Sequence, residues 1–452
     1  MIFADLALLG DQWANQVRVG VVDGVITAVV TDTEPQPGDL LVSALLPALS
    51  NLHSHSFQRA MAGMTEHRVA GRDSFWTWRD LMYRFMNRLT PEQIEAIAAL
   101  VFMEMQEAGF AAVGEFHYVH HQTGGAAYAD PAELSARIFA AAATTGIGLT
   151  HLPVLYTYGG AGAQPLAAGQ LRFGNTVDQF ARLLDAVRAR SAHLPPDTKV
   201  GIAPHSLRAT NPADLGRVLN LVHDGPVHIH VAEQPKEVAD VADWLGAPPV
   251  QWLLDNTPIN AAWCAIHATH MTGAETGRLA QSGAVAGLCP ITEANLGDGP
   301  FDGPGWLRAG GRFGIGSDSN VRISLTEELR TLEYSQRLRD IRRNIMVEPA
   351  GSVGQSLYLG AATGGAQALG RKAGQIAPGF LADLVAIDLT HPSLCALRPD
   401  QILDGLVFAA SDTVVTDLWS AGRHQVRQGR HIHHDAIVKG WQLAVKALMA
   451  AM

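Results

Sequence analysis

Residues 45–55 read LLPALSNLHSH, an apolar run that ends in two histidines separated by one residue. Side chains two apart on a β-strand point to the same face, so His53 and His55 would project together. The apolar residues before them favour a buried strand over a surface loop, which is the alternative for two neighbouring histidines. Residues 45–55 are therefore predicted to form a buried strand whose end can hold one metal ion.

Seven further segments of this strand-like kind follow along the chain. They are AAVGEFHYV (111–119), IGLTHLPVLY (147–156), KVGIAPHSL (199–207), PVHIHVAE (226–233), WCAIHATH (263–270), AVAGLCPI (284–291) and RFGIGSDS (312–319). Helical patterns separate them, such as residues 91–109, which open with a proline and close at a glycine. Eight such units predict a (β/α)8 TIM barrel of class α/β. A doubly wound sheet is the competing architecture, but no GxGxxG follows any of the runs.

The two ends of the chain are β-rich in a different way. Residues 17–30 alternate apolar runs around Asp23-Gly24, a favoured hairpin dipeptide. Residues 375–389 and 414–432 have the same short runs broken by Gly, Pro and Asp. The predicted domains are a small β-sandwich from 1–46 plus 376–435, a barrel over 47–375 and a C-terminal helix over 436–452.

Composition limits the classes of function. Of 452 residues, 47% are hydrophobic and 17% charged, which excludes a disordered chain. The net charge of −10 argues against nucleic-acid and anionic-membrane partners. Three scattered cysteines suit a reducing cytoplasm, and we expect neither a signal peptide nor a membrane span.

The chemically active side chains gather near the predicted strand ends. Active sites of barrels lie at the carboxyl ends of the strands. Six of the eight strand candidates carry a His or Asp near that end, namely His53 with His55, His117, His205, His230, His267 and Asp318. This coincidence predicts a site at that face.

Four of these residues suit a metal. We predict His53, His55, His230 and Asp318 as ligands, and interpret His228 as a satisfied interior histidine. Three histidines and one aspartate with an open water position are typical of a catalytic hydrolytic site. Zn²⁺, one ion per subunit, is the first choice, with Fe²⁺ and Mn²⁺ as alternatives. His205 ends the fourth strand where a second metal would want a carboxylate or lysine, which favours a single ion.

Three residues are predicted to handle the water. Glu233 follows His230 by three residues and suits a proton shuttle, with a helix N-terminal acid as the alternative. Asp318 would act as a base as well as a ligand, although a simple turn aspartate is the alternative. His267 could hydrogen-bond the water or the substrate.

The chain resembles the amidohydrolase superfamily over nearly its whole length. Residues 45–63 are similar to its first-strand HxH signature, HVAEQ (230–234) to the HxxE of its deaminase branch, GSDSN (316–320) to its eighth-strand Asp motif, and 374–389 to its return into the β-sandwich. The resemblance implies one metal on His53, His55, His230 and Asp318, with Glu233 and His267 as the water-handling pair. Ala48 departs from the usual glycine, which affects the backbone turn and not the ligands.

Within the superfamily, four segments resemble the N-formimidoyl-L-glutamate deiminases of histidine degradation. They are HSHSFQRAMAG (53–63), DSFWTWRDLMYRF (73–85), GEFHYVHH (114–121) and APHSLRAT (203–210). The resemblance implies hydrolysis of a small anionic substrate to N-formyl-L-glutamate and ammonia by a homodimer. It also implies substrate binding by Gln58, Arg79, Tyr118, His205 and Arg208.

Arginine suits this role because its planar fork holds a carboxylate through two charge-assisted bonds. The alternatives are a surface helix arginine for Arg79 and a packed aromatic for Tyr118. Two other functions stay open, an aminohydrolase of a purine, pyrimidine or triazine-like heterocycle and a catalytically inactive member of the superfamily used for binding or assembly. His431, His433 and His434 are interpreted as surface residues.

Overall fold

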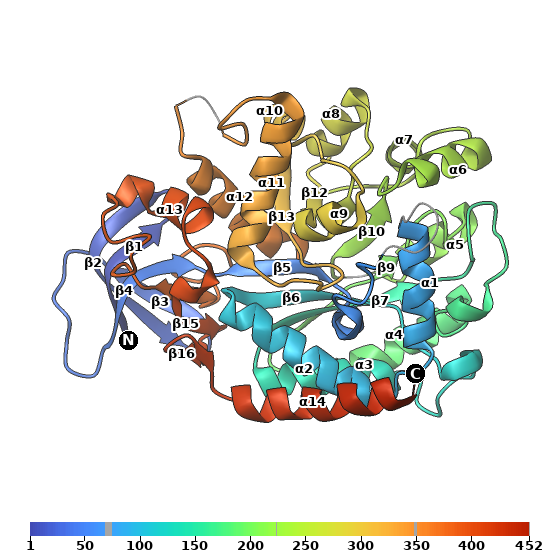
Figure 1. Cartoon of the computed structure of the whole chain (residues 1–452), viewed down its shortest axis with the longest axis horizontal. Coiled ribbons are helices and arrows are strands. Elements are labelled where there is room, and N and C mark those ends of the chain that lie inside the picture. The colour runs from blue at the N-terminus through green and yellow to red at the C-terminus, as the bar shows by residue number, and fades with distance from the viewer. Residues whose placement is uncertain (68–74, 223, 348–349, 452) are drawn as a thin grey trace.

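The computed structural model describes residues 1–67, 75–222, 224–347 and 350–451. Asp73 and Ser74 of the 73–85 segment lie outside these ranges. In the described residues no helix has the length and apolar character needed to cross a membrane. The chain forms a barrel on one side and a β domain on the other (Figure 1).

All eight predicted barrel strands are confirmed. They are β5 (Leu49–Ser54), β6 (Phe110–His117), β7 (Gly148–Leu155), the pair β8 (Lys199–Val200) and β9 (Ala203–Pro204), β10 (Val227–Val231), β11 (Trp263–His267), β12 (Val285–Leu288) and β13 (Arg312–Ile315). Neighbouring strands pair in parallel. Single bridges between Ile202 and Val227 and between Ser54 and Asp318 join the two halves, so the strands close into a ring. The fourth strand is interrupted at Gly201 and Ile202.

Helices cover the outside of the ring (Figure 1). They are α2 (Pro91–Glu107), α3 (Glu133–Thr145), α4 (Val177–Ser191), α5 (Pro212–Leu219), α6 (Pro235–Leu245), α7 (Pro249–Asn256), α8 (Gly273–Gln281), α9 (Pro290–Leu296), α10 (Gly303–Arg308), α11 (Leu325–Asp340) and α12 (Val353–Ala368). Helix α1 (Phe75–Met86) lies instead at the carboxyl ends of the strands (Figure 1). The predicted start of α2 is confirmed, because Thr90 caps the helix in a capping box and Pro91 is its first residue. Each strand therefore returns to the next through a helix, as the alternating pattern predicts.

Both chain ends build one β domain, as predicted. Its strands are β1 (Ile2–Leu9), β2 (Gln12–Val22), β3 (Val25–Val30), β4 (Leu40–Pro47), β14 (Leu384–Ile387), β15 (Val415–Ser420), β16 (Arg423–Arg427) and β17 (Arg430–His431). They form one continuous sheet in which β4 pairs with β14. Val25 of the edge strand β3 forms an antiparallel β-bridge with Leu381, which lies shortly before β14. This single sheet therefore folds back on itself. An apolar cluster that includes Ile26, Leu45 and Leu384 forms its core.

The chain ends in helix α14 (His434–Ala451), after the short α13 (Ile402–Phe408). Helix α14 packs along α2 on the outside of the barrel (Figure 1). The domain bounds 1–46, 376–435, 47–375 and 436–452 stay predictions. The interpretation of His431 as a surface residue is wrong, because its ring is buried and its Nε2 lies 3.0 Å from the carbonyl of Thr145. It anchors β17 to the end of α3.

Candidate active site

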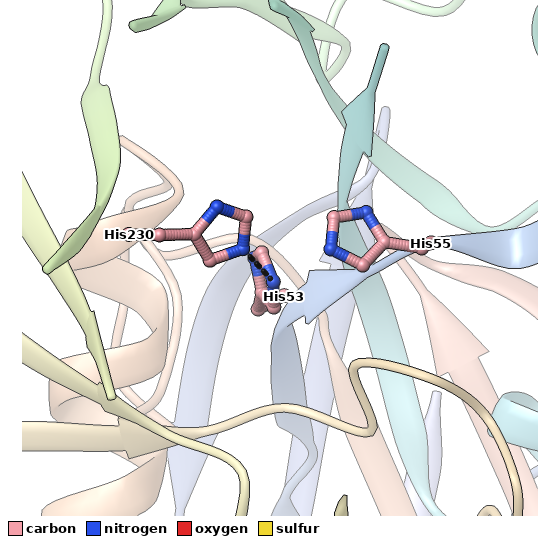
Figure 2. A group of neighbouring side chains, drawn as sticks. All are labelled: His53, His55 and His230. Atoms are coloured by element: carbon pink, nitrogen blue, oxygen red, sulfur yellow. Dashed lines mark hydrogen bonds between the residues drawn. The ribbon is translucent and has the colours of Figure 1, made fainter. Parts of the chain in front are cut away.

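The four predicted metal ligands meet at the carboxyl end of the barrel. His53 lies in β5 and His55 directly follows that strand, His230 lies in β10, and Asp318 follows β13. Nε2 of His53 lies 3.1 Å from Nε2 of His230. Oδ1 of Asp318 lies 3.5 Å from Nε2 of His53 and 3.3 Å from Nε2 of His55. Figure 2 shows the three imidazoles turned toward one another.

The outer nitrogens of two rings are held by main-chain carbonyls. Nδ1 of His55 donates to the carbonyl of Phe116 at 3.0 Å, and Nδ1 of His230 donates to that of His205 at 3.2 Å. A carbonyl can only accept, so both Nε2 atoms carry lone pairs that face the shared centre. Burial lowers the pKa of all three rings. It lowers the pKa of His53 to about 3, lowers that of His55, and holds that of His230 well below its usual value. Neutral imidazoles with converging lone pairs beside a carboxylate fit a divalent metal.

Close backbone packing places Asp318 beside the histidines. A side chain at Gly316 would meet the backbone of His53 at 2.7 Å, so only glycine allows the two strands to approach this closely. The amide of Asp318 then donates to the carbonyl of His53 at 3.0 Å, and the amide of His55 to that of Asp318 at 2.9 Å. Asp318 itself has a φ of 46°. Burial alone would raise its pKa, but hydrogen bonding and charge from His53 and its neighbours lower it.

A buried carboxyl supports the turn that follows His55. Oε1 of Glu115, on β6, accepts hydrogen bonds from the Ser56 amide at 3.0 Å and the Ser56 hydroxyl at 2.7 Å. Burial raises the pKa of Glu115 to about 7 despite these bonds. The residue two positions on, His117, turns away from the site and packs against His151, with ring centroids 5.2 Å apart. Its place near a strand end is therefore no sign of a role in the pocket.

Glu233 lies between an arginine and a histidine. Its Oε2 is 3.3 Å from a terminal nitrogen of Arg208, and its Oε1 is 3.8 Å from Nε2 of His267. The preceding residue, Ala232, has a φ of 53°, in the left-handed region. Glu237 of α6 accepts the amides of Ala232 and Glu233 at 3.2 and 3.0 Å and so fixes this turn. Burial raises the pKa of Glu233, which suits a group that takes up and releases a proton.

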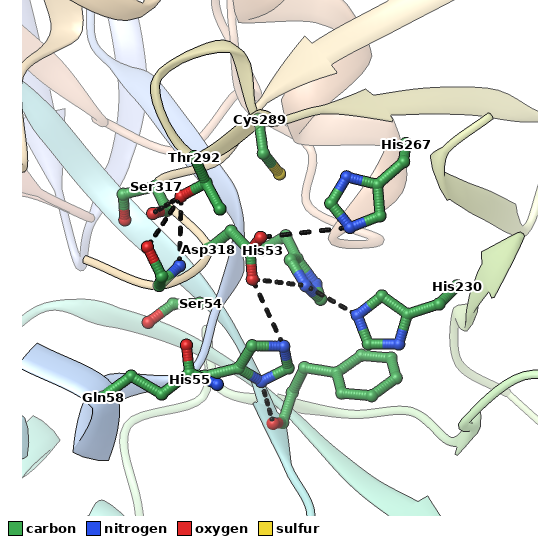
Figure 3. Close-up of polar contacts among 12 residues, drawn as sticks. His53, Ser54, His55, Gln58, His230, His267, Cys289, Thr292, Ser317 and Asp318 are labelled. Carbon is green, nitrogen blue, oxygen red and sulfur yellow. Dashed lines mark hydrogen bonds and ion pairs between the residues drawn. The ribbon is translucent and has the colours of Figure 1, made fainter. Parts of the chain in front are cut away.

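His267 is held by a carboxylate on the side away from the metal ligands. Nδ1 lies 3.2 Å from Oε1 of Glu293. Nε2 lies 3.9 Å from Oδ2 of Asp318, the contact drawn in Figure 3. Burial would lower the pKa of His267, but Glu233, Glu293 and Asp318 together raise it to about 10. Its Nε2 is therefore a hydrogen-bond donor that faces Glu233 and Asp318.

The predicted substrate-binding residues line the same pocket as the ligands. Its walls include His55, Gln58, Arg79, Tyr118, His205, Arg208, His230, Glu233, His267 and Asp318, while His53 lies below them. The pocket and its mouth together hold about 560 Å³ of empty space, part of which is open to solvent. The Gln58 side-chain amide donates to the Tyr118 hydroxyl at 2.8 Å. The guanidinium of Arg79 lies over the ring of Tyr83, 5.5 Å from its centroid.

Sequence reasoning missed several residues of the site. Tyr83, Tyr156 and Trp78 line the pocket, and Glu237 and Glu293 hold Glu233 and His267. Glu237 follows Glu233 by one helical turn, and this spacing is the signal that could have pointed to it. The interpretation of His228 as a satisfied interior histidine is confirmed, because its ring bonds the Ala368 carbonyl at 2.7 Å. The ring of His270 likewise bonds the carbonyl of Asp298 at 2.8 Å. Both rings are structural.

Comparisons with known proteins agree with this architecture. A sequence model described as the amidohydrolase family matches residues 44–424, and one described as formimidoylglutamate deiminase HutF, N-terminal domain, matches residues 1–42. The chain is 50% identical over 438 residues to a formimidoylglutamate deiminase of Pseudomonas aeruginosa, and covers 95% of each protein.

Solved structures show the same fold. An amidohydrolase from Brucella melitensis superposes with a TM-score of 0.96 at 47% identity, covering 99% of each chain. An adenosine deaminase from Xanthomonas campestris, solved with bound zinc, superposes with a TM-score of 0.82 at 23% identity, covering 99% of this chain and 98% of that one. The second likeness extends to the fold alone.

Proposed function

The chain belongs to the amidohydrolase family and, within it, to the formimidoylglutamate deiminases, and we propose that it hydrolyses N-formimidoyl-L-glutamate to N-formyl-L-glutamate and ammonia. One observation of the site carries this substrate choice: Arg79 and Arg208 line the pocket that also contains the metal ligands. A dicarboxylate needs fixed cations at a set distance from the reacting carbon.

The electrostatics of the pocket support an anionic substrate. Burial, and then the charges of Arg208 and Arg79, hold the pKa of His205 well below its usual value. Both arginines also lower the pKa of Tyr156, which burial nevertheless raises above its usual value. His205 and Tyr156 thus lie within reach of both positive charges. We propose that Arg79, Arg208, His205, Gln58 and Tyr118 bind the carboxylates and orient the chain of the substrate.

We propose that His53, His55, His230 and Asp318 hold one Zn²⁺ per subunit. A divalent metal, when bound there, supplies an activated water at neutral pH. The three neutral imidazoles and one carboxylate suit zinc, and Fe²⁺ and Mn²⁺ accept the same donor set. The catalytic face of the barrel is the expected place for such a site.

The chain's own side chains then move the proton. We propose that Glu233 accepts a proton from the water whose oxygen adds to the formimidoyl carbon, and delivers this proton to the formimidoyl nitrogen. The proton of the added hydroxyl follows, the oxygen becomes the formyl carbonyl as the carbon–nitrogen bond breaks, and ammonia leaves. Nε2 of His267 donates a hydrogen bond across the reacting centre, since Glu293 holds its other nitrogen. Asp318 orients the nucleophile as a second acceptor. Arg208 contacts both Glu233 and Glu237, and so couples the substrate end of the pocket to the proton shuttle.

We also propose that the enzyme works in the cytoplasm as a homodimer, for which the support is the resemblance to the family. The rival function is an aminohydrolase of a heterocycle, as in the adenosine deaminase with the same fold. A ring substrate would need stacking and amide donors more than two arginines.

The test is ammonia release from a panel of substrates by the purified enzyme with its zinc content measured. We expect turnover of N-formimidoyl-L-glutamate, slower turnover of the aspartate analogue, and no turnover of adenosine, guanine or cytosine. Activity on the heterocycles alone would refute the proposed substrate. Absence of bound metal together with absence of activity after reconstitution would instead favour a binding protein.

A matched pair of variants tests the arginine. Arg208→Met should raise KM by about 30-fold or more, because truncating one partner of a buried charge pair costs about 2 kcal/mol or more. Arg217→Met removes an exposed arginine paired with Asp178 and should leave KM unchanged. An equal KM in both variants would show that Arg208 does not bind the substrate.

A further inference from the structure

A second set of metal-type ligands lies beside the three histidines and shares Asp318 with them, since the ring of His267 stacks on that of His230 with centroids 5.6 Å apart. A nitrogen of His267, Sγ of Cys289 and a carboxylate oxygen of Asp318 all lie within 4.8 Å of one another, and all three residues are buried. Figure 3 shows the sulfur of Cys289 turned toward His267 and Asp318. None of the predicted roles makes use of Cys289, which follows β12 directly.

The two oxygens of Asp318 face different partners. Oδ1 is closest to the two histidines at the end of β5, at 3.3 Å from His55 and 3.5 Å from His53. Oδ2 lies 3.9 Å from Nε2 of His267. A carboxylate arranged in this way can bridge two metal ions, as carboxylates do in two-metal hydrolytic sites with ions about 3.5–4 Å apart.

The second set also has suitable chemistry and spacing. Thiolate, imidazole and carboxylate are the three side-chain ligands that zinc prefers, at roughly 2.0–2.3 Å. Ligand atoms no more than 4.8 Å apart can therefore share one ion after small side-chain movements. Further acceptors stand close by, because Glu233 and Glu293 lie 3.8 and 3.2 Å from the His267 ring nitrogens. Their negative charge favours an added cation, which would displace the proton from His267 when it binds.

We propose that His267, Cys289 and Asp318 form a second transition-metal site, weaker than the first and inhibitory when filled. It is weaker because two divalent ions that share one carboxylate repel each other at short distance. It inhibits because an ion on His267 takes the nitrogen that would otherwise donate to the reacting centre. The inference rests on the proposed function, since it takes the first zinc and the role of His267 from there.

The experiment starts from the holoenzyme with one zinc per subunit, in a Cys395→Ser background that removes the exposed thiol. Cobalt(II) is then added, with bound metal measured by equilibrium dialysis and elemental analysis. We expect one further ion per subunit, the near-ultraviolet charge-transfer band of a cobalt–thiolate bond, and a parallel loss of turnover. Excess zinc should cause the same loss of turnover.

Two variants assign the thiol. Cys289→Ser and Cys289→Ala should both lose the thiolate band, and Cys289→Ala should lose the added ion while it keeps the first zinc. Cys264→Ser changes a second buried thiol, on β11, and should keep the band. A holoenzyme that binds one zinc and shows no thiolate band with excess cobalt, or a band that persists in both Cys289 variants, would overturn this inference alone. A wild-type protein that binds no first metal would overturn the proposed function instead.

Discussion

The two ends of the barrel bury charge in opposite ways. At the amino ends of the strands, Arg371 and Arg423 contact Asp197 and Asp383 in what we call the amino-end ion cluster. Arg371 lies 2.9 Å from Asp383, and Arg423 holds both oxygens of Asp197 at 2.8 and 2.9 Å. Two positive and two negative side chains balance there, and they join the barrel to the β domain through β16 and the start of β14.

At the carboxyl ends, buried charges face a pocket. Glu233, Asp318 and Arg208 all line the cavity, and their partners leave room for a ligand. The pKa of the Glu233 carboxyl is raised, and the pKa of His267 rises to about 10. Both side chains therefore hold a proton more tightly than they would in water. The difference teaches that matched buried ion pairs make the folded state depend on keeping both partners, while buried charges that line a cavity serve binding and proton transfer.

The variant with the largest expected effect removes a charge from the pocket at the carboxyl ends of the strands. Glu233→Gln keeps the size of the side chain and removes the proton acceptor. We expect kcat to fall about 10²–10⁴-fold, the usual contribution of general acid–base catalysis. Steady-state ammonia release at saturating substrate measures the effect.

Metal content and urea unfolding are the controls for Glu233→Gln. Zinc per subunit should stay at one, and the free energy of unfolding should not fall, because burial already opposes the charge of Glu233. Near-normal turnover with metal bound would show that another group moves the proton.

The next prediction concerns a variant that disrupts the amino-end ion cluster. Arg371→Met leaves Asp197 and Asp383 buried with one fewer positive partner, so the free energy of unfolding should fall by about 3–5 kcal/mol. Urea denaturation followed by circular dichroism measures this. The kcat of the molecules that remain folded should stay near wild type, because the cluster lies at the opposite end of the strands from the pocket.

A surface pair gives the control for Arg371. Arg398 lies 3.2 Å from Asp400, and both side chains are more than two-thirds exposed. Arg398→Met should change the free energy of unfolding by about 1 kcal/mol or less. If Arg371→Met lowered kcat as strongly as Glu233→Gln, the division of labour between the two ends would be wrong.

The same contrast explains how far sequence reasoning reached. The eight barrel strands are short apolar runs, and their histidines and aspartate stand at the strand ends, so local patterns predict both. Pairings such as β1 with β4 and β4 with β14 join residues far apart in the chain, and no local pattern specifies them. Glu237 and Glu293 lie in the first turns of helices. Acidic residues are common there because they interact favourably with the helix dipole, so neither residue stood out in the sequence.

Backbone conformation was also beyond the sequence patterns. Ala232, His267 and Asp318 all have positive φ, at 53°, 68° and 46°. Residues other than glycine adopt this region at a cost, and surrounding contacts must hold them there. The amide contacts of Glu237 around Ala232 are visible only in three dimensions. Sequence therefore predicted the groups that face the pocket better than the groups that position them.

The smallest expected effect on activity comes from changing Glu237, a buried carboxylate near the pocket that does not itself line it. Glu237 accepts two main-chain amides and lies 4.0 Å from Nε of Arg208, so it is a positioning residue for Glu233 and Arg208. Glu237→Gln keeps one acceptor oxygen and should lower kcat/KM about ten-fold, as expected for weakened hydrogen bonds around a charged group. Glu237→Ala should lower it further, because both amides then lose their acceptor.

A matched carboxylate separates positioning from mere stability. Glu275 is also buried, and accepts the amides of Thr272 and Gln251 at 2.7 and 3.0 Å at the start of α8. Glu275→Gln should lower the free energy of unfolding about as much as Glu237→Gln while kcat and KM stay near wild type. The pH profile of kcat/KM adds a second readout, because displaced Glu233 and Arg208 should shift its acidic limb in the Glu237 variants only. Equal kinetics in Glu237→Gln and Glu275→Gln would mean that Glu237 stabilises its helix and nothing more, and that the rest of the pocket positions Glu233 without it.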